Sequence, residues 1–363
     1  FQPLLYQVAT AALSPAQIAQ PVRSILRNQR NCTTVLGEVE AIDTTSRTVK
    51  GKQGELPYDY LIVATGTGNN YFGHDDWEEA APGLKSIEDA TGLRQRILSA
   101  FEQAEITADE DARKSFMTFL VVGAGPTGVE MAGAIAELAK HTLKKDFRNI
   151  DVNKTRVLLV DAGKSVLASF APTLSKEAVR DLEELGVEIL LEKTVSSCTD
   201  AGATIGGEFI PARTIVWAAG VKASPAAAWL GAEKDRAGRV IVTPDLSLAG
   251  HENIFVIGDT ASVKSKDDKF VPGLAPAAMQ QGDYVAKVIK AKLSGKPAPA
   301  SVDLHFMSFN GYFAWWLWGI IHILPLISFR NRLIVSLEWL FAYVTNQRSA
   351  RLITVNKETE KEI

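Results

Sequence analysis

The chain's most informative pattern is a G-x-G-x-x-G formed by Gly123, Gly125 and Gly128. The pattern is weak by itself, but here it follows the apolar run 119–122 and opens a helical stretch. The next apolar run, 157–160, ends at a carboxylate. Strand, glycine turn, helix and strand form a β-α-β unit that binds dinucleotides, because the glycines admit a pyrophosphate to the helix N-terminus.

Asp161, at the end of the second strand, is the residue that would bind the ribose of the nucleotide. A carboxylate there accepts hydrogen bonds from ribose hydroxyls and repels a phosphate, which favours NADH over NADPH. The interval from Gly125 to Asp161 exceeds the usual interval of about 20 residues. The long helix and the loop at 148–155 account for the difference. A tight turn without a ligand is the alternative.

Other candidate residues are of types that alone leave two interpretations open. Glu130, which we place in the first helical turn, could face a nicotinamide or simply favour the helix dipole. Gly258-Asp259 follows an apolar run, and its carboxylate could accept from a ligand hydroxyl or cap a helix. Thr65-Gly66 and Ala219-Gly220 end two further runs and could be simple turns.

Periodicity predicts the elements that position these residues. We expect a helix over 129–147, with one stripe of Met131, Ile135, Leu138 and Phe147. Ser86 and Asp89 resemble a capping box for a helix over 86–105, whose buried stripe is Leu93, Ile97, Phe101 and Ala104. Further helices are expected over 174–185 and 277–293. Strands are expected over 33–36, 39–43, 48–49, 60–63, 119–122, 157–160, 187–191, 214–217 and 254–257.

Composition excludes several classes of protein. The 363 residues suggest two or three domains, and 46% hydrophobic with 22% charged residues is ordinary for a globular protein. A net charge of −3 gives no reason to expect nucleic acid. Cys32, Cys198 and five scattered histidines show no disulfide framework and no metal-ligand spacing. Residue 1 is Phe and the first Met is Met117, so we expect residues to precede Phe1 in the whole protein.

The C-terminal segment differs in kind, because residues 304–329 contain no Asp, Glu, Lys or Arg. Its clean helical part, 312–324, would be about 20 Å long, short of a hydrocarbon core of roughly 30 Å. Arg330 and Arg332 follow, and then a second apolar stripe comprises Ile334, Leu337, Phe341 and Val344. Aromatic and basic residues on short stripes favour a helix lying in a membrane interface. A buried core or a dimer interface is the alternative.

Several segments in order resemble the type II NADH:quinone oxidoreductases, single-subunit flavoproteins that do not pump protons. The matching segments are FQPLLYQVA at 1–9, YDYLIVATG at 58–66, YFG at 71–73, PGLK at 82–85, VVGAGPTGVE at 121–130, WAAG at 217–220, IGD at 257–259, APAAMQQG at 275–282 and the tail 328–343. The resemblance implies an α/β fold with two Rossmann-like dinucleotide-binding domains and a C-terminal amphipathic helical membrane anchor. It implies FAD in 1–112 and 250–300, NADH in 113–249, and the anchor in 301–363.

The resemblance also implies roles for residues. NADH would bind at Gly123, Gly125, Pro126, Thr127 and Gly128, with Asp161, Ala219 and Gly220 beside it. Glu130 matches the family's functionally important glutamate at the nicotinamide end. Thr65, Gly66 and Gly258 fall on the FAD side, and Asp259 matches the aspartate on the ribityl chain. Ala275, Pro276, Ala277 and Gln280 match the stretch against the flavin ring, where quinone arrives; Glu130 and Gln280 are the candidate catalytic residues. Pro276 replaces a Gln found in the best-known version.

Two departures concern the FAD side. The family begins with an FAD-binding strand and glycine-rich loop that this sequence lacks, and its strand region before the membrane helices is short here, at 300–309. We therefore expect part of the FAD site to lie outside this sequence.

The implied activity transfers a hydride from NADH to FAD and two electrons to a membrane quinone. The resemblance places the protein peripherally on the cytoplasmic face of the inner membrane, in the respiratory chain, with homodimer formation left open. One rival is another flavin reductase that acts on disulfides or ferredoxin. The other is a flavin-less, NADH-binding, membrane-associated remnant.

Overall fold

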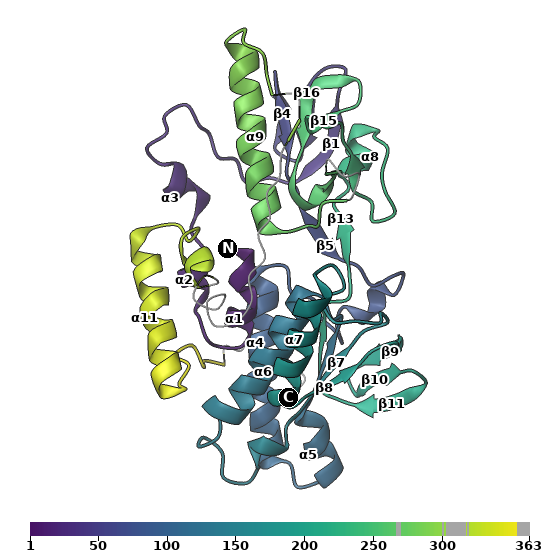
Figure 1. Ribbon diagram of the computed structural model, residues 1–363, viewed down its shortest axis with the longest axis vertical. Helices are drawn as coiled ribbons and strands as arrows, with labels where there is room; N and C mark the ends of the chain where they lie inside the picture. The colour runs from purple at the N-terminus through teal and green to yellow at the C-terminus, as the bar shows by residue number, and fades with distance from the viewer. Residues whose placement is uncertain (266–269, 300, 303–316, 318, 354–363) are drawn as a thin grey trace. The chain divides into compact units, whose positions relative to one another are not determined.

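The computed structural model describes residues 1–265, 270–299, 301–302, 317 and 319–353 (Figure 1). These residues form two compact units. Unit 1 contains residues 1–27, 69–220 and the described residues from 317 onward, and unit 2 contains residues 28–68 and 221–302. The units are not divided at the boundaries expected for the cofactor domains, because the helices of 1–27 and 86–106 pack with 113–220. The assignment of each cofactor to its segments stays a prediction.

Unit 1 is built on a parallel sheet in the order β12-β6-β7-β8. Its strands are β6 (Thr118–Val122), β7 (Arg156–Val160), β8 (Val187–Leu190) and β12 (Thr214–Trp217). All five residues of β6 and all four of β12 are buried, as expected for parallel strands covered on both faces. The strands expected over 119–122, 157–160, 187–191 and 214–217 are confirmed.

The two faces of this sheet enter two different cores, because successive side chains of a strand point to opposite faces. Phe119 and Val121 pack among the helices. Leu120 and Val122 pack toward a three-stranded antiparallel sheet that the sequence did not predict. That sheet consists of β9 (Val195–Thr199), β10 (Gly202–Ile205) and β11 (Glu208–Pro211).

Helix α4 spans Ile87–Ile106 and begins at the capping box that the sequence predicts. The Asp89 N–H donates to Ser86 Oγ at 3.0 Å, and the Ser86 N–H donates to Asp89 Oδ2 at 2.9 Å. The two bonds satisfy backbone donors that the helix itself cannot. The predicted stripe is fully buried: Leu93, Ile97, Phe101 and Ala104.

Helix α6 spans Pro126–Glu137, so the expected helix over 129–147 is wrong at both ends. It begins earlier because proline is well suited to a first helical position, where no N–H is needed. A π-helical turn over Leu138–Thr142 follows, in which the Leu143 N–H donates to the Leu138 oxygen at 2.9 Å. Met131, Ile135 and Leu138 are fully buried as predicted, whereas Phe147 lies beyond the helix.

Further helices complete unit 1. They are η1 (Gln2–Leu4), α1 (Leu5–Ala9), α2 (Pro15–Ile18), α3 (Val22–Leu26), η2 (Asp75–Trp77), α5 (Glu110–Phe116), η4 (Val152–Lys154), α7 (Pro172–Glu184) and α11 (Phe329–Thr345). Helices α6 and α7 lie side by side against the sheet (Figure 1). The helix expected over 174–185 is α7, and it ends before Gly186, which adopts a φ of +75°.

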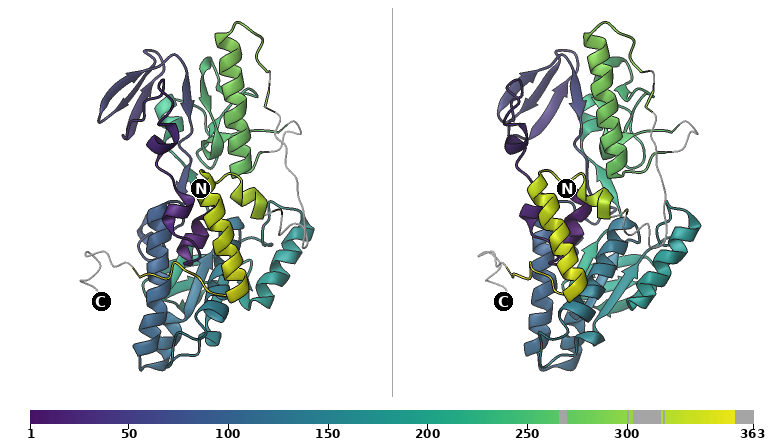
Figure 2. Two further views of the ribbon diagram at one scale, coloured as in Figure 1. Left: turned by 90° about the vertical axis from the view of Figure 1, so that its left-hand side faces the viewer. Right: turned by 60° about the vertical axis from the view of Figure 1, so that its left-hand side comes forward.

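Helix α11 docks on the N-terminal helices of the same unit (Figure 2). The Asn331 Nδ2–H donates to the Ala16 oxygen at 3.2 Å, and the Trp339 Nε1–H donates to Gln7 Oε1 at 2.8 Å. Of the helix expected over 312–324, residues 312–316 and 318 lie outside the described residues, and residues 317 and 319–323 are helical. Within the described ranges, no helix has both the length and the apolar character needed to cross a membrane.

Unit 2 contains a three-stranded sheet in the order β15-β16-β4, in which β16 and β4 run parallel. Its elements, in chain order, are β1 (Val39–Asp43), β2 (Thr48–Gly51), β3 (Gly54–Pro57), β4 (Leu61–Val63), β5 (Thr67–Asn69), β13 (Val221–Ala223), α8 (Ala226–Leu230), β14 (Val240–Ile241), β15 (Ser247–Leu248), β16 (His251–Val256), η5 (Gly258–Thr260), β17 (Ala261–Ser262) and α9 (Ala275–Leu293). The strand expected over 33–36 is wrong, because Val35 and Leu36 are exposed and pair with no strand.

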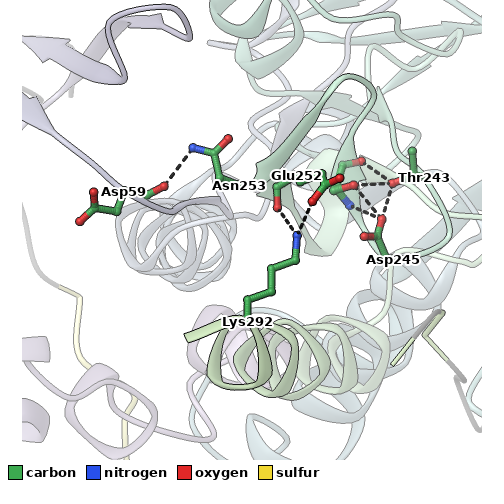
Figure 3. A network of polar contacts seen from close by, with 7 residues as sticks. Asp59, Thr243, Asp245, Glu252, Asn253 and Lys292 are labelled. Carbon is green, nitrogen blue, oxygen red and sulfur yellow. Dashed lines mark hydrogen bonds and ion pairs between the residues drawn. The ribbon is translucent and has the colours of Figure 1, made fainter. Parts of the chain in front are cut away.

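Helix α9 is fixed to the sheet of unit 2 through its last turns (Figure 3). Lys292 Nζ donates to the Glu252 oxygen at 2.8 Å and pairs with Glu252 Oε2 at 3.3 Å. On the neighbouring residue of β16, the Asn253 Nδ2–H donates to the Asp59 oxygen at 2.9 Å. The Lys292 contacts fix the last turns of α9 against the start of β16, and α9 also packs against η5, which follows the other end of this strand.

Candidate functional site

The glycine-rich loop after β6 packs closely against neighbouring main chain. Gly123 has a φ of +107°, and a Cβ there would lie 2.4 Å from the main chain of Ala218. A Cβ at Gly128 would lie 1.7 Å from the Gly123 oxygen. Neither position admits a side chain, so the glycines are needed for the close approach of main chain to main chain.

The loop leads directly into the N-terminus of α6, which no side chain caps. Gly125 is the N-cap of α6 and Pro126 its first residue. A Cβ at Gly125 would meet nothing within 4 Å, so the space beside the helix end is clear. The uncapped N–H groups of the first turn, which includes Thr127 and Gly128, are therefore available to an anion. These residues fit a pyrophosphate.

Asp161 follows β7 and faces the same loop. Its Oδ2 accepts from the Ala124 N–H at 2.6 Å, and its Oδ1 accepts from the Gly163 N–H at 2.6 Å. A carboxylate has about four acceptor positions, so two remain for ribose hydroxyls. The sequence predicted the carboxylate but not its second task, which is to hold the loop.

Ala219 and Gly220 lie next to the glycine-rich loop, because Trp217 of β12 pairs with Val122 of β6. The Ala218 N–H donates to the Val122 oxygen at 2.7 Å. The structure thus brings the residues predicted to bind NADH together at the carboxyl end of one parallel sheet, where α/β folds bind ligands.

Glu130 occupies the fifth position of α6 and not its first turn, so the helix-dipole interpretation is wrong. Burial raises the pKa of Glu130 to about 8, from an ordinary 4.5. Burial also raises the pKa of Tyr6, and the charge of Glu130 raises it further, which places the two groups near each other. Among the described residues Glu130 has no hydrogen-bond or ion-pair partner, so its neutral form is favoured at neutral pH.

The raised pKa of Glu130 predicts how stability depends on pH. Between pH 4.5 and about 8 the native carboxyl keeps a proton that the unfolded chain has lost. The free energy of unfolding therefore falls as pH rises through this window, by up to about 1.4 kcal/mol per pH unit. Glu130→Gln should flatten this dependence, measured by urea unfolding at pH 5, 7 and 9. The matched control Glu183→Gln on exposed α7 should keep it, and equal slopes in all three proteins would contradict the assignment.

A second set of predicted residues meets in unit 2, beyond the parallel strands β4 and β16. Thr260 Oγ1 donates to the Gly66 oxygen at 3.1 Å and lies 3.4 Å from Thr65 Oγ1, which is 2.5 Å from Ser224 Oγ. Gly258 turns the chain with a φ of +68°. The structure therefore brings Thr65, Gly66, Gly258 and Asp259 together at the ends of the two strands. Their role in binding a ligand stays a prediction.

Asp259 presents an unused carboxylate at these strand ends. Gly273 lies against it, because a Cβ there would be 3.0 Å from Asp259 Oδ1. In the described part of the chain, no donor bonds this carboxylate. Asp259 and Gly273 share a pocket with Ala277 in the first turn of α9. Free acceptor oxygens beside small residues fit a polyhydroxyl chain such as the ribityl group of a flavin.

The first turn of α9 contains Ala275, Pro276 and Ala277, the stretch predicted to contact the flavin. The Gln280 Nε2–H donates to the Pro276 oxygen at 3.2 Å, so this side chain binds its own helix. Sequence reasoning missed the next residue. Gln281 is 2% exposed, and its Oε1 accepts from the Gly258 N–H at 2.7 Å, which fixes the turn that carries Asp259.

Comparison with known proteins identifies the family. The pyridine nucleotide-disulphide oxidoreductase family matches residues 1–282. The type II NADH:quinone oxidoreductase Ndh of Mycobacterium tuberculosis is 44% identical over 387 residues, covering 98% of this chain and 82% of the relative. The chain belongs to the type II NADH:quinone oxidoreductases. The Staphylococcus aureus type II NADH:quinone oxidoreductase is 32% identical and covers 80% of this chain and 72% of the relative.

The fold agrees with that of a solved structure. The structure of NDH2 from Plasmodium falciparum in complex with NADH has a TM-score of 0.81 at 18% identity, covering 98% of this chain and 92% of the other. The likeness shows the α/β pyridine nucleotide-disulphide oxidoreductase fold with Rossmann-like domains. The predicted family and fold class are confirmed to this extent.

Proposed function

We propose that this protein is an FAD-dependent NADH:quinone oxidoreductase. The observation that carries the proposal is the uncapped N-terminus of α6, approached by a loop whose glycines leave no room for side chains. In a chain that belongs to the type II NADH:quinone oxidoreductases, such a site is the NADH site. When bound, FAD supplies the redox chemistry, accepting a hydride from NADH and passing two electrons to quinone.

On the nucleotide side, the chain binds and orients NADH. The N–H groups at the start of α6 hold the pyrophosphate, and Asp161 accepts from the adenosine ribose. Ala219 and Gly220 line the continuation of the site beyond β12. Glu130 keeps a proton in a partly buried position near Tyr6, because burial holds its pKa at about 8. A neutral carboxyl there avoids placing a charge beside the nicotinamide.

On the flavin side, Asp259 accepts from the ribityl hydroxyls, with Thr65 and Gly66 on the neighbouring strand end. Gln281 holds the Gly258 turn, so it positions Asp259 without touching the cofactor. Ala275, Pro276 and Ala277 lie against the flavin, and Gln280 lies one turn further along α9 on the quinone side.

Helix α11 binds the protein peripherally to the membrane that contains the quinone. Its exposed apolar residues recur at helical spacing and form one stripe: Leu333, Leu337, Leu340, Phe341 and Val344. The opposite face docks on unit 1 through Asn331 and Trp339. A helix with one apolar face and a docked opposite face suits the plane of a membrane interface. We place this membrane contact on the cytoplasmic face of the inner membrane, with a homodimer through the same stripe as the alternative.

Acceptor specificity tests the proposed reaction. With FAD bound, NADH oxidation should proceed with a short-chain benzoquinone and not with a disulfide or a ferredoxin. The described part of the chain has two free cysteines, the exposed Cys32 and the buried Cys198, and no disulfide. Turnover with a disulfide or ferredoxin at rates equal to those with quinone would contradict the proposal.

The choice of nucleotide should respond to the charge after β7. Asp161→Asn combined with Ala162→Arg removes the carboxylate and adds a cation for a ribose phosphate. We expect the ratio of kcat/KM for NADPH to that for NADH to rise by about a hundredfold, or roughly 2.7 kcal/mol. Steady-state kinetics with both nucleotides measures this ratio, and Ala162→Arg alone serves as the control. A ratio unchanged in the double variant would rule out the ribose role of Asp161.

A further inference from the structure

Phe72 combines an exposed aromatic ring with an unfavourable backbone conformation. Its side chain is 64% exposed and its φ is +54°, a left-handed value that bulky residues rarely adopt. Outliers of this kind persist only where their surroundings hold them, and they gather at functional sites. Gly73 follows with a φ of +97°, so two successive residues turn the chain sharply.

Asn70 holds this turn against the end of β12. Its Oδ1 accepts from the Phe72 N–H at 2.9 Å, and its main-chain oxygen accepts from the Trp217 Nε1–H at 2.8 Å. The Asn70 N–H also donates to the Gly220 oxygen at 3.2 Å. The turn and the strand end therefore form one hydrogen-bonded assembly within unit 1.

The ring of Phe72 lies directly on Gly220. A Cβ at Gly220 would be 2.7 Å from Phe72 Cζ, so only glycine allows the ring this approach. The ring thus covers main chain at the carboxyl end of the sheet, although two thirds of the side chain remains in solvent. Covering Gly220 alone does not account for so large an exposed aromatic surface.

The order of the strands shows which part of a dinucleotide would meet this ring. Asp161 follows β7 and would bind the adenosine ribose, and Gly125 follows the central strand β6 and would face the pyrophosphate. Gly220 follows β12, on the other side of β6 from β7. A nucleotide that crosses the sheet end in this direction places its nicotinamide half on the β12 side.

We propose that Phe72 packs against the nicotinamide half of bound NADH and sets its position beside Gly220. This inference rests on the proposed function. A flat aromatic face suits the planar nicotinamide ring, and offset stacking or an edge-to-face arrangement gives such pairs their affinity. Asn70 holds the left-handed backbone of Phe72, so the main chain that carries the ring is already ordered before NADH binds. Binding therefore costs this residue little conformational entropy.

Anaerobic flavin reduction in the FAD-loaded, full-length protein tests the inference, because its dependence on NADH concentration gives Kd and the reduction rate separately. We expect Phe72→Ala to raise Kd for NADH about tenfold, which equals about 1.4 kcal/mol. Phe72→Tyr should stay within about twofold of the unmodified protein. Reoxidation by a short-chain benzoquinone should be unchanged in both. Phe209→Ala, which removes an exposed aromatic ring from β11, is the matched control.

Phe72→Gly separates the ring from the turn, because glycine adopts a positive φ freely. If the ring binds nucleotide, Phe72→Gly loses NADH affinity as Phe72→Ala does. If the residue only shapes the turn, Phe72→Gly binds NADH like the unmodified protein, and that result overturns the inference. An unchanged Kd in Phe72→Ala overturns it as well. Failure of NADH to reduce the flavin of the unmodified protein would instead overturn the proposed function, and the inference with it.

Discussion

Replacing Gly128 with alanine should weaken NADH binding severely. The added Cβ would lie 1.7 Å from the Gly123 oxygen, which is main chain and cannot turn aside like a side chain. The loop must open, and the first N–H groups of α6 then lose their position for the pyrophosphate. We expect Kd for NADH to rise by at least about a hundredfold, or roughly 2.7 kcal/mol. Titration of NADH into the FAD-loaded protein measures the loss.

Gly133→Ala is the matched control for this prediction, because it adds the same methyl group to the same helix. A Cβ at Gly133 would meet only Leu182 and Leu185 side-chain atoms, both at 3.7 Å. Alanine is also the better helix former, so this variant should bind NADH normally and unfold no more easily. Flavin content and thermal unfolding of both variants separate a loop effect from global misfolding. Normal NADH affinity in a folded Gly128→Ala protein would contradict the proposed site.

Placing charges on the stripe of α11 should release the protein from membranes. Leu337, Leu340 and Phe341 are each half exposed or more, so glutamate at all three positions leaves the docked face of α11 intact. Burial of each apolar side chain contributes about 1.5–3 kcal/mol. The triple variant should therefore bind anionic phospholipid vesicles at least about a thousandfold more weakly. Vesicle sedimentation measures the affinity.

The control for the vesicle experiment carries the same added charge elsewhere. Phe209, Ile241 and Leu293 are also exposed apolar residues, and none belongs to α11. Glutamate at these three positions should leave vesicle binding within a few-fold of the unmodified protein, with the difference set by the shared negative charge. If the unmodified protein does not sediment, and the α11 variant instead converts a dimer to a monomer, the stripe is a dimer interface and the membrane proposal is wrong.

Local signals in the sequence predicted the framework of the nucleotide site. Buried parallel strands are continuous apolar runs, so β6, β7 and β12 could be located to within a residue. The position of Asp161 followed from the β-α-β pattern. Ser86 and Asp89 predicted the start of α4 because a capping box depends only on neighbouring residues.

Features that depend on distant residues escaped prediction. The raised pKa of Glu130 comes from burial, and a sequence cannot show which segments cover a helix face; Tyr6, one of its neighbours, is 124 positions away. The left-handed turn at Phe72 is stabilised by Gly220, which no local pattern connects to it. The antiparallel strands β9, β10 and β11 are short and alternate weakly. Ser, Thr and Gly occupy much of β9 and β10, and β11 is exposed along most of its length.

The buried position of Gln281 could have been predicted from the sequence. Helical spacing from Ala277 through Gln281 to Val285 and Val288 marks the buried face of α9, and a glutamine on such a face needs a hydrogen-bond partner. Its partner is the Gly258 N–H, in the turn that carries Asp259. The neighbouring Gln280 was predicted from the family resemblance alone, whereas burial and a hydrogen bond to the Gly258 N–H show that Gln281 holds this turn.

Flavin content and anaerobic reduction of the detergent-purified protein test the central claim most directly. The proposed function predicts about one FAD per chain, bleached by NADH and restored by a benzoquinone, with two electrons passed in each cycle. Absorbance at the flavin maximum follows all three states in one sample. A protein that contains no flavin and takes up none from added FAD, or a bound flavin that NADH leaves oxidised, would contradict the account.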